Sequence, residues 1–184
     1  MRKVKKFKLT SEFIVDISGV KLFRIKALIE FGNVKAGDLG GYIEKEENLS
    51  HMGDAWVSDD ARISGNAQVF GNAQVFGNAQ VFGDAWVFGN ARVFGNARVS
   101  GDAQVFGDAR VSGDKDYAYA HGFGSCNRTT TFFRLKDGDV GVRCGCFYGT
   151  LAQFRDKVCE THGETKKAQE YLMLADLMEI RFKN

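Results

Sequence analysis

Valine or isoleucine recurs at every sixth residue through the middle of the chain, and alanine follows most of them four positions later. Glycine, asparagine, aspartate and other polar residues fill most of the positions between. Repetition at a fixed period marks a solenoid, in which each repeat buries its apolar side chains only by stacking on its neighbours. The pattern therefore predicts a stacked coil whose interior is formed by these alanines and by ten aliphatic side chains: Val57, Ile63, Val69, Val75, Val81, Val87, Val93, Val99, Val105 and Val111.

The six-residue unit resembles the hexapeptide signature of left-handed parallel β-helices, the triangular coils of many bacterial acyltransferases. Both have an aliphatic residue that points inward and a small residue four positions later. The resemblance implies that three units form one turn, so that residues 18 apart stack, and that Val57 to about Asp116 form a little over three turns. Glycine followed by asparagine or aspartate suits the corners, because these residues tolerate positive φ better than others do.

Phenylalanine follows the valine in many repeats and is expected to point outward, because side chains alternate along a strand. Stacking at 18 residues aligns Phe70, Phe88 and Phe106 in one column and places Trp86 in the neighbouring column. Exposed apolar patches of this kind mark contact sites. The pattern favours an oligomer, a trimer or a dimer, with Phe70, Trp86, Phe88 and Phe106 at the interface. The alternative is that the phenylalanines only cover the coil itself.

The segments on either side of the repeat have different patterns, which divide the chain into three parts. Residues 1–50 are predicted to form an N-terminal β-strand cap, 51–114 the hexapeptide-repeat β-helix, and 115–184 a C-terminal α/β module. The cap is expected from short β-rich runs at Phe7–Leu9, Phe13–Ile17 and Leu22–Ile29. It would cover the open end of the coil, where backbone groups are otherwise unpaired.

The C-terminal part has two β-rich runs, Thr129–Leu135 and Val140–Phe147, joined by a turn centred on Asp137 and Gly138. Apolar residues at helical spacing then predict one helix from Thr150 to about Cys159 and a second from about Thr165. The predicted fold class is mainly β: a left-handed triangular parallel β-helix with an N-terminal β cap and a C-terminal ββαα module.

Two segments outside the repeat resemble uncharacterised bacterial and phage β-helix proteins that carry a small C-terminal α/β module. The first is the glycine-rich stretch from Lys35 to Ile43, and the second includes Gly124-Ser125, Thr130 to Phe133, Lys136 to Gly138 and Cys144 to Phe147. The resemblance implies a bacterial or phage setting and brings no assigned chemistry with it.

Composition excludes several classes of function. The net charge of +2 does not indicate a nucleic-acid-binding protein, and no run of about 18 apolar residues predicts a membrane span. Asp16 and Lys21 interrupt the apolar stretch that a signal peptide would need, and four cysteines without such a signal favour a reducing cytoplasm. The lysines near the N-terminus, Lys6 among them, are expected on a solvated strand edge. We therefore expect a cytoplasmic protein with neither a membrane partner nor a specific nucleic-acid partner.

The segment from His121 to Thr130 is the strongest candidate for ligand binding. Its glycines allow close approach of the backbone, its polar side chains donate hydrogen bonds, and its arginine suits phosphate or carboxylate. The predicted ligand-binding residues, with two arginines from the adjoining strands, are Ser125, Asn127, Arg128, Thr129, Thr130, Arg134 and Arg143. The ligand would be an anionic small molecule such as a nucleotide. The alternative is that the segment is only a linker.

Neither catalysis nor a cofactor is predicted. The acyltransferase resemblance implies a histidine base at a trimer interface and a loop for the acyl donor, whereas His51, His121 and His162 all lie outside the uninterrupted coils. The repeats also contain no long insertion. The cysteines have two interpretations. They are either buried or incidental thiols, or ligands of a zinc ion with C-x-C and C-x-x-H spacing. Its ligands would be Cys144, Cys146, Cys159 and His162.

These features together predict a non-enzymatic, oligomeric accessory protein of bacterial or phage origin. The coil would hold subunits together, while the C-terminal module would bind and sequester an anionic small molecule, for example a nucleotide signal of host immunity. Two alternatives remain: a structural or protein-interaction module that inhibits or scaffolds a protein partner, and an acyltransferase-like enzyme.

Overall fold

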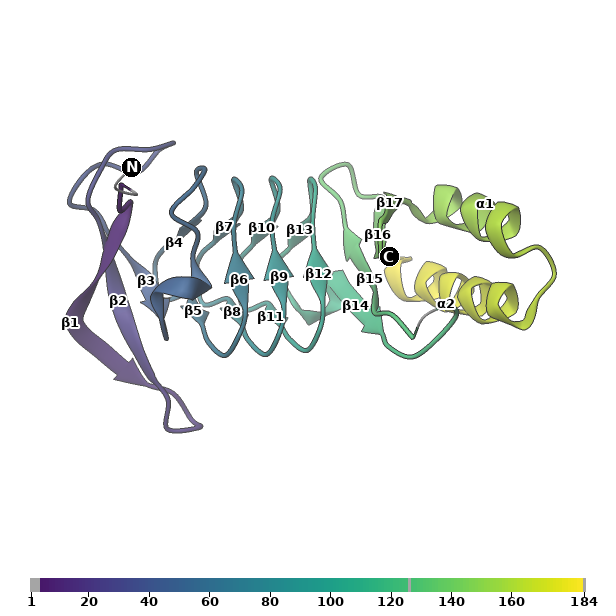
Figure 1. Ribbon diagram of the computed structural model, residues 1–184, viewed down its shortest axis with the longest axis horizontal. Coiled ribbons are helices and arrows are strands. Elements are labelled where there is room, and N and C mark those ends of the chain that lie inside the picture. The colour runs from purple at the N-terminus through teal and green to yellow at the C-terminus, as the bar shows by residue number, and fades with distance from the viewer. Residues whose placement is uncertain (1–3, 126, 184) are drawn as a thin grey trace.

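The computed structural model describes residues 4–125 and 127–183. It has three parts in a row along its long axis: an N-terminal β-hairpin cap, a stack of coils, and a C-terminal sheet covered by two helices (Figure 1). The fold is mainly β, as the repeat predicts. Within the described residues, no helix is long and apolar enough to cross a membrane.

The coil is built from two-residue parallel strands that pair at an interval of 18 residues. Val93, for example, pairs with Val75 on one side and with Val111 on the other, which confirms the predicted stacking. The strands are β4 (Trp56–Val57), β5 (Arg62–Ile63), β6 (Gln68–Val69), β7 (Gln74–Val75), β8 (Gln80–Val81), β9 (Trp86–Val87), β10 (Arg92–Val93), β11 (Arg98–Val99), β12 (Gln104–Val105) and β13 (Arg110–Val111).

The strands form three parallel stacks, β4-β7-β10-β13, β6-β9-β12 and β5-β8-β11, the last of which continues into the N-terminal cap through β3 (Leu39–Ile43). Tyr42 and Ile43 of β3 pair in parallel with Arg62 and Ile63. The coil therefore begins before the repeat becomes visible in the sequence, and it has about four turns rather than a little over three.

The interior is filled as the repeat predicts. All ten aliphatic residues, and the alanines four positions after them, have no exposed surface. Burying one valine side chain stabilises the folded state by roughly 1.5–3 kcal/mol. The stacked valines and alanines form most of the hydrophobic core of this part. Glycine is needed at the corners: Gly77 has a φ of +70°, and a Cβ there would lie 3.1 Å from the backbone nitrogen of Gly95 in the next turn.

The N-terminal cap is an antiparallel hairpin, β1 (Phe7–Val15) and β2 (Lys21–Ala27), which continues into β3. Two buried donors complete it by binding carbonyl groups of the coil. Lys6 Nζ donates to the carbonyls of Ala55 at 2.7 Å and Gly53 at 3.2 Å. Asn48, in the 3-10 helix η1 (Glu46–Asn48), uses its side-chain amide to donate to two carbonyls of the next turn. Lys6 is only 1% exposed, so the prediction of a solvated edge is wrong for this residue.

The C-terminal module has four strands where the sequence predicts two. After η2 (Asp114–Asp116) come β14 (Tyr117–Ala120), β15 (Thr130–Arg134), β16 (Val140–Cys144) and β17 (Phe147–Thr150), all antiparallel in this order. The helices α1 (Leu151–His162) and α2 (Lys166–Phe182) follow. The ββαα prediction is wrong for two reasons: Tyr117–Ala120 forms an additional strand, β14, and Gly145, with a φ of +58°, turns the chain after Cys144. The single expected return strand is therefore a hairpin.

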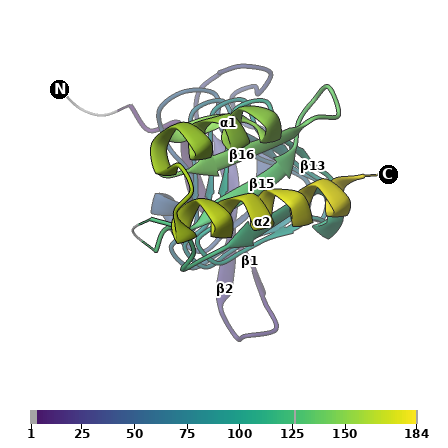
Figure 2. The same cartoon turned by 90° about the vertical axis from the view of Figure 1, so that its right-hand side faces the viewer.

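This sheet lies between the last turn of the coil and the two helices (Figures 1 and 2). On its coil side, Thr131 Oγ1 accepts a hydrogen bond from the backbone N–H of Gln104 at 2.9 Å, and Phe133 joins the core of the coil. On its other side, Phe132 and Val142 pack with Phe154 of α1 in a second core. The sheet closes the C-terminal end of the coil and carries the helices.

Candidate functional site

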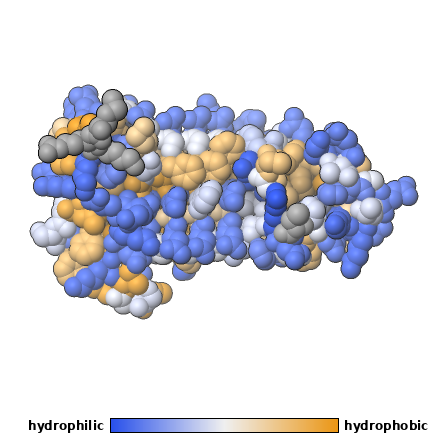
Figure 3. Space-filling model, viewed as in Figure 1, coloured by the Kyte–Doolittle hydropathy of each residue, from blue (hydrophilic) through white to orange (hydrophobic). Residues whose placement is uncertain are grey.

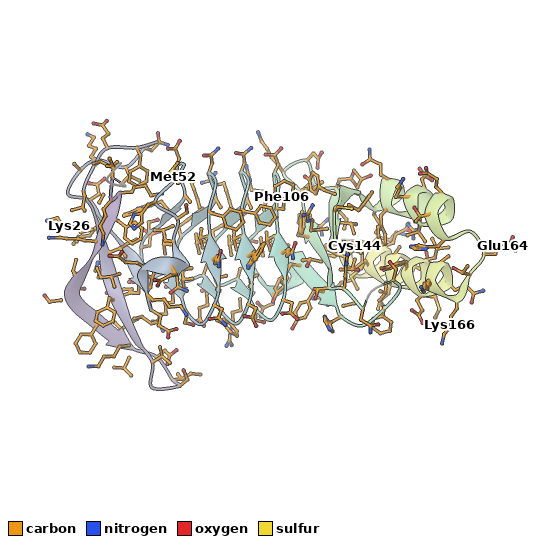
Figure 4. All side chains as sticks on the ribbon, in the orientation of Figure 1. Lys26, Met52, Phe106, Cys144, Glu164 and Lys166 are labelled. Atoms are coloured by element: carbon orange, nitrogen blue, oxygen red, sulfur yellow. The ribbon has the colours of Figure 1, made fainter. Side chains whose placement is uncertain are left out.

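A pocket of about 210 Å³ lies in the C-terminal module, between the loop before β15, the turn from β16 to β17, and both helices. Cys144, labelled in Figure 4, lies on its sheet side. Apolar side chains form part of the wall, and polar groups from four elements surround the rest. The polar lining residues include Ser125, Arg128, Cys144, Cys146, Lys157, Thr161, His162 and Tyr171.

Tyr171 of α2 connects the loop to the sheet inside this pocket. Its hydroxyl accepts a hydrogen bond from the backbone N–H of Ser125 at 3.0 Å and lies 3.7 Å from the thiol of Cys144. Gly124 has a φ of +69°, and a Cβ there would collide with the ring of Tyr171. Burial raises the pKa of the Tyr171 hydroxyl, so this group stays protonated at neutral pH and remains a hydrogen-bond donor.

The pocket is lined by three nitrogen-bearing side chains, Arg128 from the loop and Lys157 and His162 from α1, and no described residue of its lining is aspartate or glutamate. Arg128 and Lys157 are exposed, and Lys157 Nζ also forms an ion pair with Glu160 at 2.9 Å. The guanidinium of Arg128 lies over Gly145, where a Cβ would force it to shift. The ring of His162 stacks against Tyr171 at a centroid distance of 5.8 Å. Three nitrogen-bearing side chains around a small space suit a phosphate or carboxylate group.

The structure brings some of the predicted loop residues into this pocket and places others outside it. Ser125 and Arg128 line it. Thr130 is buried behind it and donates a hydrogen bond to the sulfur of Cys144 at 3.2 Å. Thr129 Oγ1 lies 2.9 Å from Nδ1 of His121, and Asn127 is exposed with a φ of +45°. Cys126, in the same loop, lies outside the described residues.

Neither of the two strand arginines reaches the pocket. Arg134 lies at the far end of β15, where it donates to the carbonyl of Phe182 at 2.9 Å. Arg143 lies on the opposite face of the sheet from Cys144, because neighbouring strand residues point to opposite sides. There it donates to Oε1 of Gln104 at 3.4 Å and lies 5.6 Å from the ring centroid of Phe106.

The thiols and histidines do not gather into a metal site. Among the described residues, no group of three or more histidine, cysteine, aspartate or glutamate side chains is arranged to hold a metal ion. Cys144 and the exposed Cys146 both line the pocket, whereas Cys159 on α1 is exposed and is not among the lining residues. Because the turn at Gly145 separates Cys144 from Cys146, these two thiols do not share a strand face as the sequence suggests.

A second surface feature is the stacked aromatic column of the coil. The rings of Phe70 and Phe88 stack at a centroid distance of 4.7 Å, and those of Phe88 and Phe106 at 4.4 Å. Trp86 pairs between Gln68 and Gln104 beside this column and is 41% exposed. Figure 3 shows a hydrophobic band along this side of the coil.

A wider groove of about 860 Å³ opens at the N-terminal end of this column. Phe70 and Trp86 form one side of it, and the cap contributes Leu49, Met52 and Glu47 among others. Met52, labelled in Figure 4, is 76% exposed. The groove is more apolar and more open than the pocket at Tyr171, and its acidic groups come from η1.

The coil resembles a known repeat family. Residues 61–77, 85–101 and 91–105 match the model of the YdcK beta solenoid repeat. These stretches all lie within the coil, so the similarity concerns its architecture and includes neither the pocket nor the helices. No curated protein matches the chain.

Sequence reasoning assigned Lys157, Thr161 and Tyr171 to no site, and it considered His162 only as a zinc ligand. All four residues lie on helices that the sequence does predict. The signal that was available is the helix pattern itself, since Tyr171 is one of the residues at helical spacing that predict α2 and is buried in it. The pattern does not indicate which loop the helix covers.

Proposed function

We propose that the protein is a non-enzymatic binding module whose C-terminal pocket holds a small anion, or the anionic group of a larger ligand. The observation that carries this proposal is the grouping of Arg128, Lys157 and His162 around one pocket, without an acidic residue among its described lining. The backbone amide and hydroxyl of Ser125 and the hydroxyl of Tyr171 add neutral hydrogen-bonding groups at the same place.

The size of the pocket narrows the class of ligand. Sites that enclose a drug-sized molecule measure about 300–1,000 Å³, and this pocket measures about 210 Å³. A nucleotide would therefore place its phosphate in the pocket and its base and sugar outside. Sequestration of a nucleotide signal in the cytoplasm of a bacterium is consistent with this arrangement, and so is capture of any other phosphorylated or carboxylated compound.

The chemistry around Cys144 supports binding without a change to the ligand. Catalysis of acyl or phosphoryl transfer needs a base beside a nucleophile, paired carboxylates or a metal ion. Cys144, the lining thiol beside Tyr171, accepts a hydrogen bond from Thr130 and faces a protonated hydroxyl. Neither neighbour is a base that would activate the thiol.

Calorimetry with inorganic phosphate, a linear mononucleotide and a cyclic dinucleotide tests the proposal. Arg128→Ala should weaken binding by about tenfold to a hundredfold, since a hydrogen bond to a charged group contributes about 1.5–3 kcal/mol. Arg98→Ala, which removes an exposed arginine from the coil, serves as the matched control and should bind as the unmodified protein does. Chromatography of the recovered ligand should show it intact.

Two outcomes would overturn the proposal. A recovered ligand that is chemically changed would indicate an enzyme. Equal affinity of the Arg128→Ala variant, or no binding of any of the three probes, would remove the pocket as an anion site and favour a protein partner instead.

We further propose that the coil is left-handed and triangular and that it assembles the protein into oligomers through Phe70, Trp86, Phe88 and Phe106. Three strand stacks per 18-residue turn support the triangular section. The exposure of Trp86 beside a continuous stack of rings supports an assembly surface, because aromatic side chains are enriched at the centre of interfaces.

A further inference from the structure

One side of the coil has a regular order of side chains from its N-terminal to its C-terminal end. We call it the aromatic face, and it consists of the stack β6-β9-β12 with Gln68, Trp86 and Gln104 and the adjoining column of Phe70, Phe88 and Phe106. Strands in such a stack are about 4.8 Å apart. Each turn therefore places one ring of the column, and one outward side chain of the stack, at its own level.

Residues of opposite charge flank the two ends of this face. At the N-terminal end, η1 packs on β6, and Leu49 pairs with Val69, so that buried Asn48 precedes Gln68 in the stack. Exposed Glu47, next to Asn48 in η1, lies at the same level beside it. At the C-terminal end, Arg143 donates to Gln104 from one level beyond it. Within the described residues, neither Glu47 nor Arg143 forms an ion pair.

We propose that the aromatic face binds a second copy of this chain in antiparallel orientation, with the two-fold axis at Trp86. Glu47, Gln68, Trp86, Gln104 and Arg143 occupy five successive levels, and Trp86 is the middle one. A two-fold axis there places Trp86 against its own copy and Gln68 against Gln104. It also places Glu47 against Arg143 of the second copy, twice per dimer. This inference specifies the partner in the assembly proposed above and rests on it.

The shape of the surface fits the same arrangement. The groove of about 860 Å³ lies at the Glu47 end, beside Phe70 and Trp86. Tyr148 lies at the Arg143 end, 40% exposed and packed edge-on against Phe106 at a centroid distance of 4.8 Å. An antiparallel copy brings its half-exposed Tyr148, with Phe106, to the open groove of the other chain.

Parallel packing of the same faces is disfavoured by charge. It would place Glu47 near Glu47 and Arg143 near Arg143, and like charges brought together at an interface are unfavourable. It would also leave groove against groove at one end and Tyr148 against Tyr148 at the other. The charges at the two ends of the aromatic face therefore favour a closed antiparallel dimer over an assembly in which the chains run parallel.

Disulfide trapping in the full-length protein tests the orientation. Gln68→Cys and Gln104→Cys variants are mixed and oxidised with diamide, and the linked peptides are identified by mass spectrometry to separate them from links through Cys146 or Cys159. The antiparallel dimer predicts that position 68 links to position 104. Links of 68 to 68 and of 104 to 104 would overturn the orientation while leaving the assembly in place.

Light scattering with charge variants tests the contact itself. Arg143→Glu and Glu47→Lys should each weaken dimerisation by about tenfold, and the double variant should recover it, because the reversed pair is restored across the axis. Arg92→Glu, on another side of the coil, should leave the mass of a dimer unchanged. A monomer in the unmodified protein would overturn both the orientation and the assembly, without bearing on anion binding at Arg128. A double variant no better than the single variants would show that these two residues do not meet.

Discussion

Lys6 shows how one residue acts at the end of the coil. The first turn presents carbonyl groups with no strand before it, and the ammonium of Lys6 binds two of them while it lies 4.6 Å from the ring centroid of Phe31. In the sequence, Lys6 is one of a cluster of lysines, and such a cluster ordinarily indicates a solvated strand edge. Nothing local to Lys6 distinguishes it from exposed Lys8, because its acceptors, Gly53 and Ala55, lie almost fifty residues away.

Burial lowers the pKa of Lys6 from 10.5 to about 8, and nearby Asp54 only partly opposes this effect. Between about pH 8 and pH 10.5, the unfolded chain therefore binds more protons at this site than the folded chain. The free energy of unfolding should rise across that range as the burial of a charged ammonium ceases to be a cost. Urea denaturation of the unmodified protein between pH 7.5 and 9.5 should detect this slope.

The matched variants are Lys6→Met and Lys8→Met. Lys6→Met should lose the slope and, near pH 7.5, should be less stable by about 1–3 kcal/mol, because two buried carbonyls lose their donor. Lys8→Met should keep the slope, since Lys8 is exposed. Burial raises the pKa of Tyr117, Tyr148 and Tyr171 above 10, so these groups titrate above the chosen window. An equal slope in the Lys6→Met variant would assign the titration to another group.

At the scale of elements, the coil could be predicted from the sequence and the C-terminal sheet only in part. Every coil strand follows from one repeated unit, so the register of 18 residues is specified ten times over. The strands β14 and β17 have no such redundancy, and Gly145 is a single residue whose positive φ converts a predicted strand into a hairpin. Strand alternation alone places Arg143 and Cys144 on opposite faces of the sheet. The sequence was therefore sufficient to predict that these two residues do not share a site.

The register predicts a contrast between two coil substitutions. Val87→Asp places a carboxylate in an interior with no exposed surface, which should unfold the coil because an unpaired buried charge has no compensating partner. Gln80→Glu should be neutral or slightly stabilising, since Gln80 points outward and pairs between Arg62 and Arg98 in the neighbouring turns. Thermal unfolding followed by circular dichroism measures both. Similar melting temperatures for the two variants would contradict the inward and outward assignment.

At the scale of the whole molecule, the three parts have separate tasks. The hairpin cap and the C-terminal sheet close the two ends of the coil, and the two helices cover the outer side of that sheet (Figures 1 and 2). The coil presents the aromatic face, and the helices complete the pocket at Tyr171. Half of this pocket could be predicted: the loop with Ser125 and Arg128 is evident from its polar and glycine-rich sequence. The other half comes from α1 and α2. Which loop these helices cover depends on tertiary contacts, and no repeat in this part of the sequence reveals those contacts.

The central claim is that an anion binds between the loop and the helices, and a crystal structure of the protein with a bound nucleotide tests it most directly. The account predicts phosphate density within hydrogen-bonding distance of Arg128, Lys157 and His162, with the hydroxyl of Tyr171 beside it and the base directed outward. Crystals grown with the Arg128→Ala variant should show the pocket without the nucleotide. Nucleotide density in the groove beside Trp86, or at any site that does not include Arg128, would contradict the account.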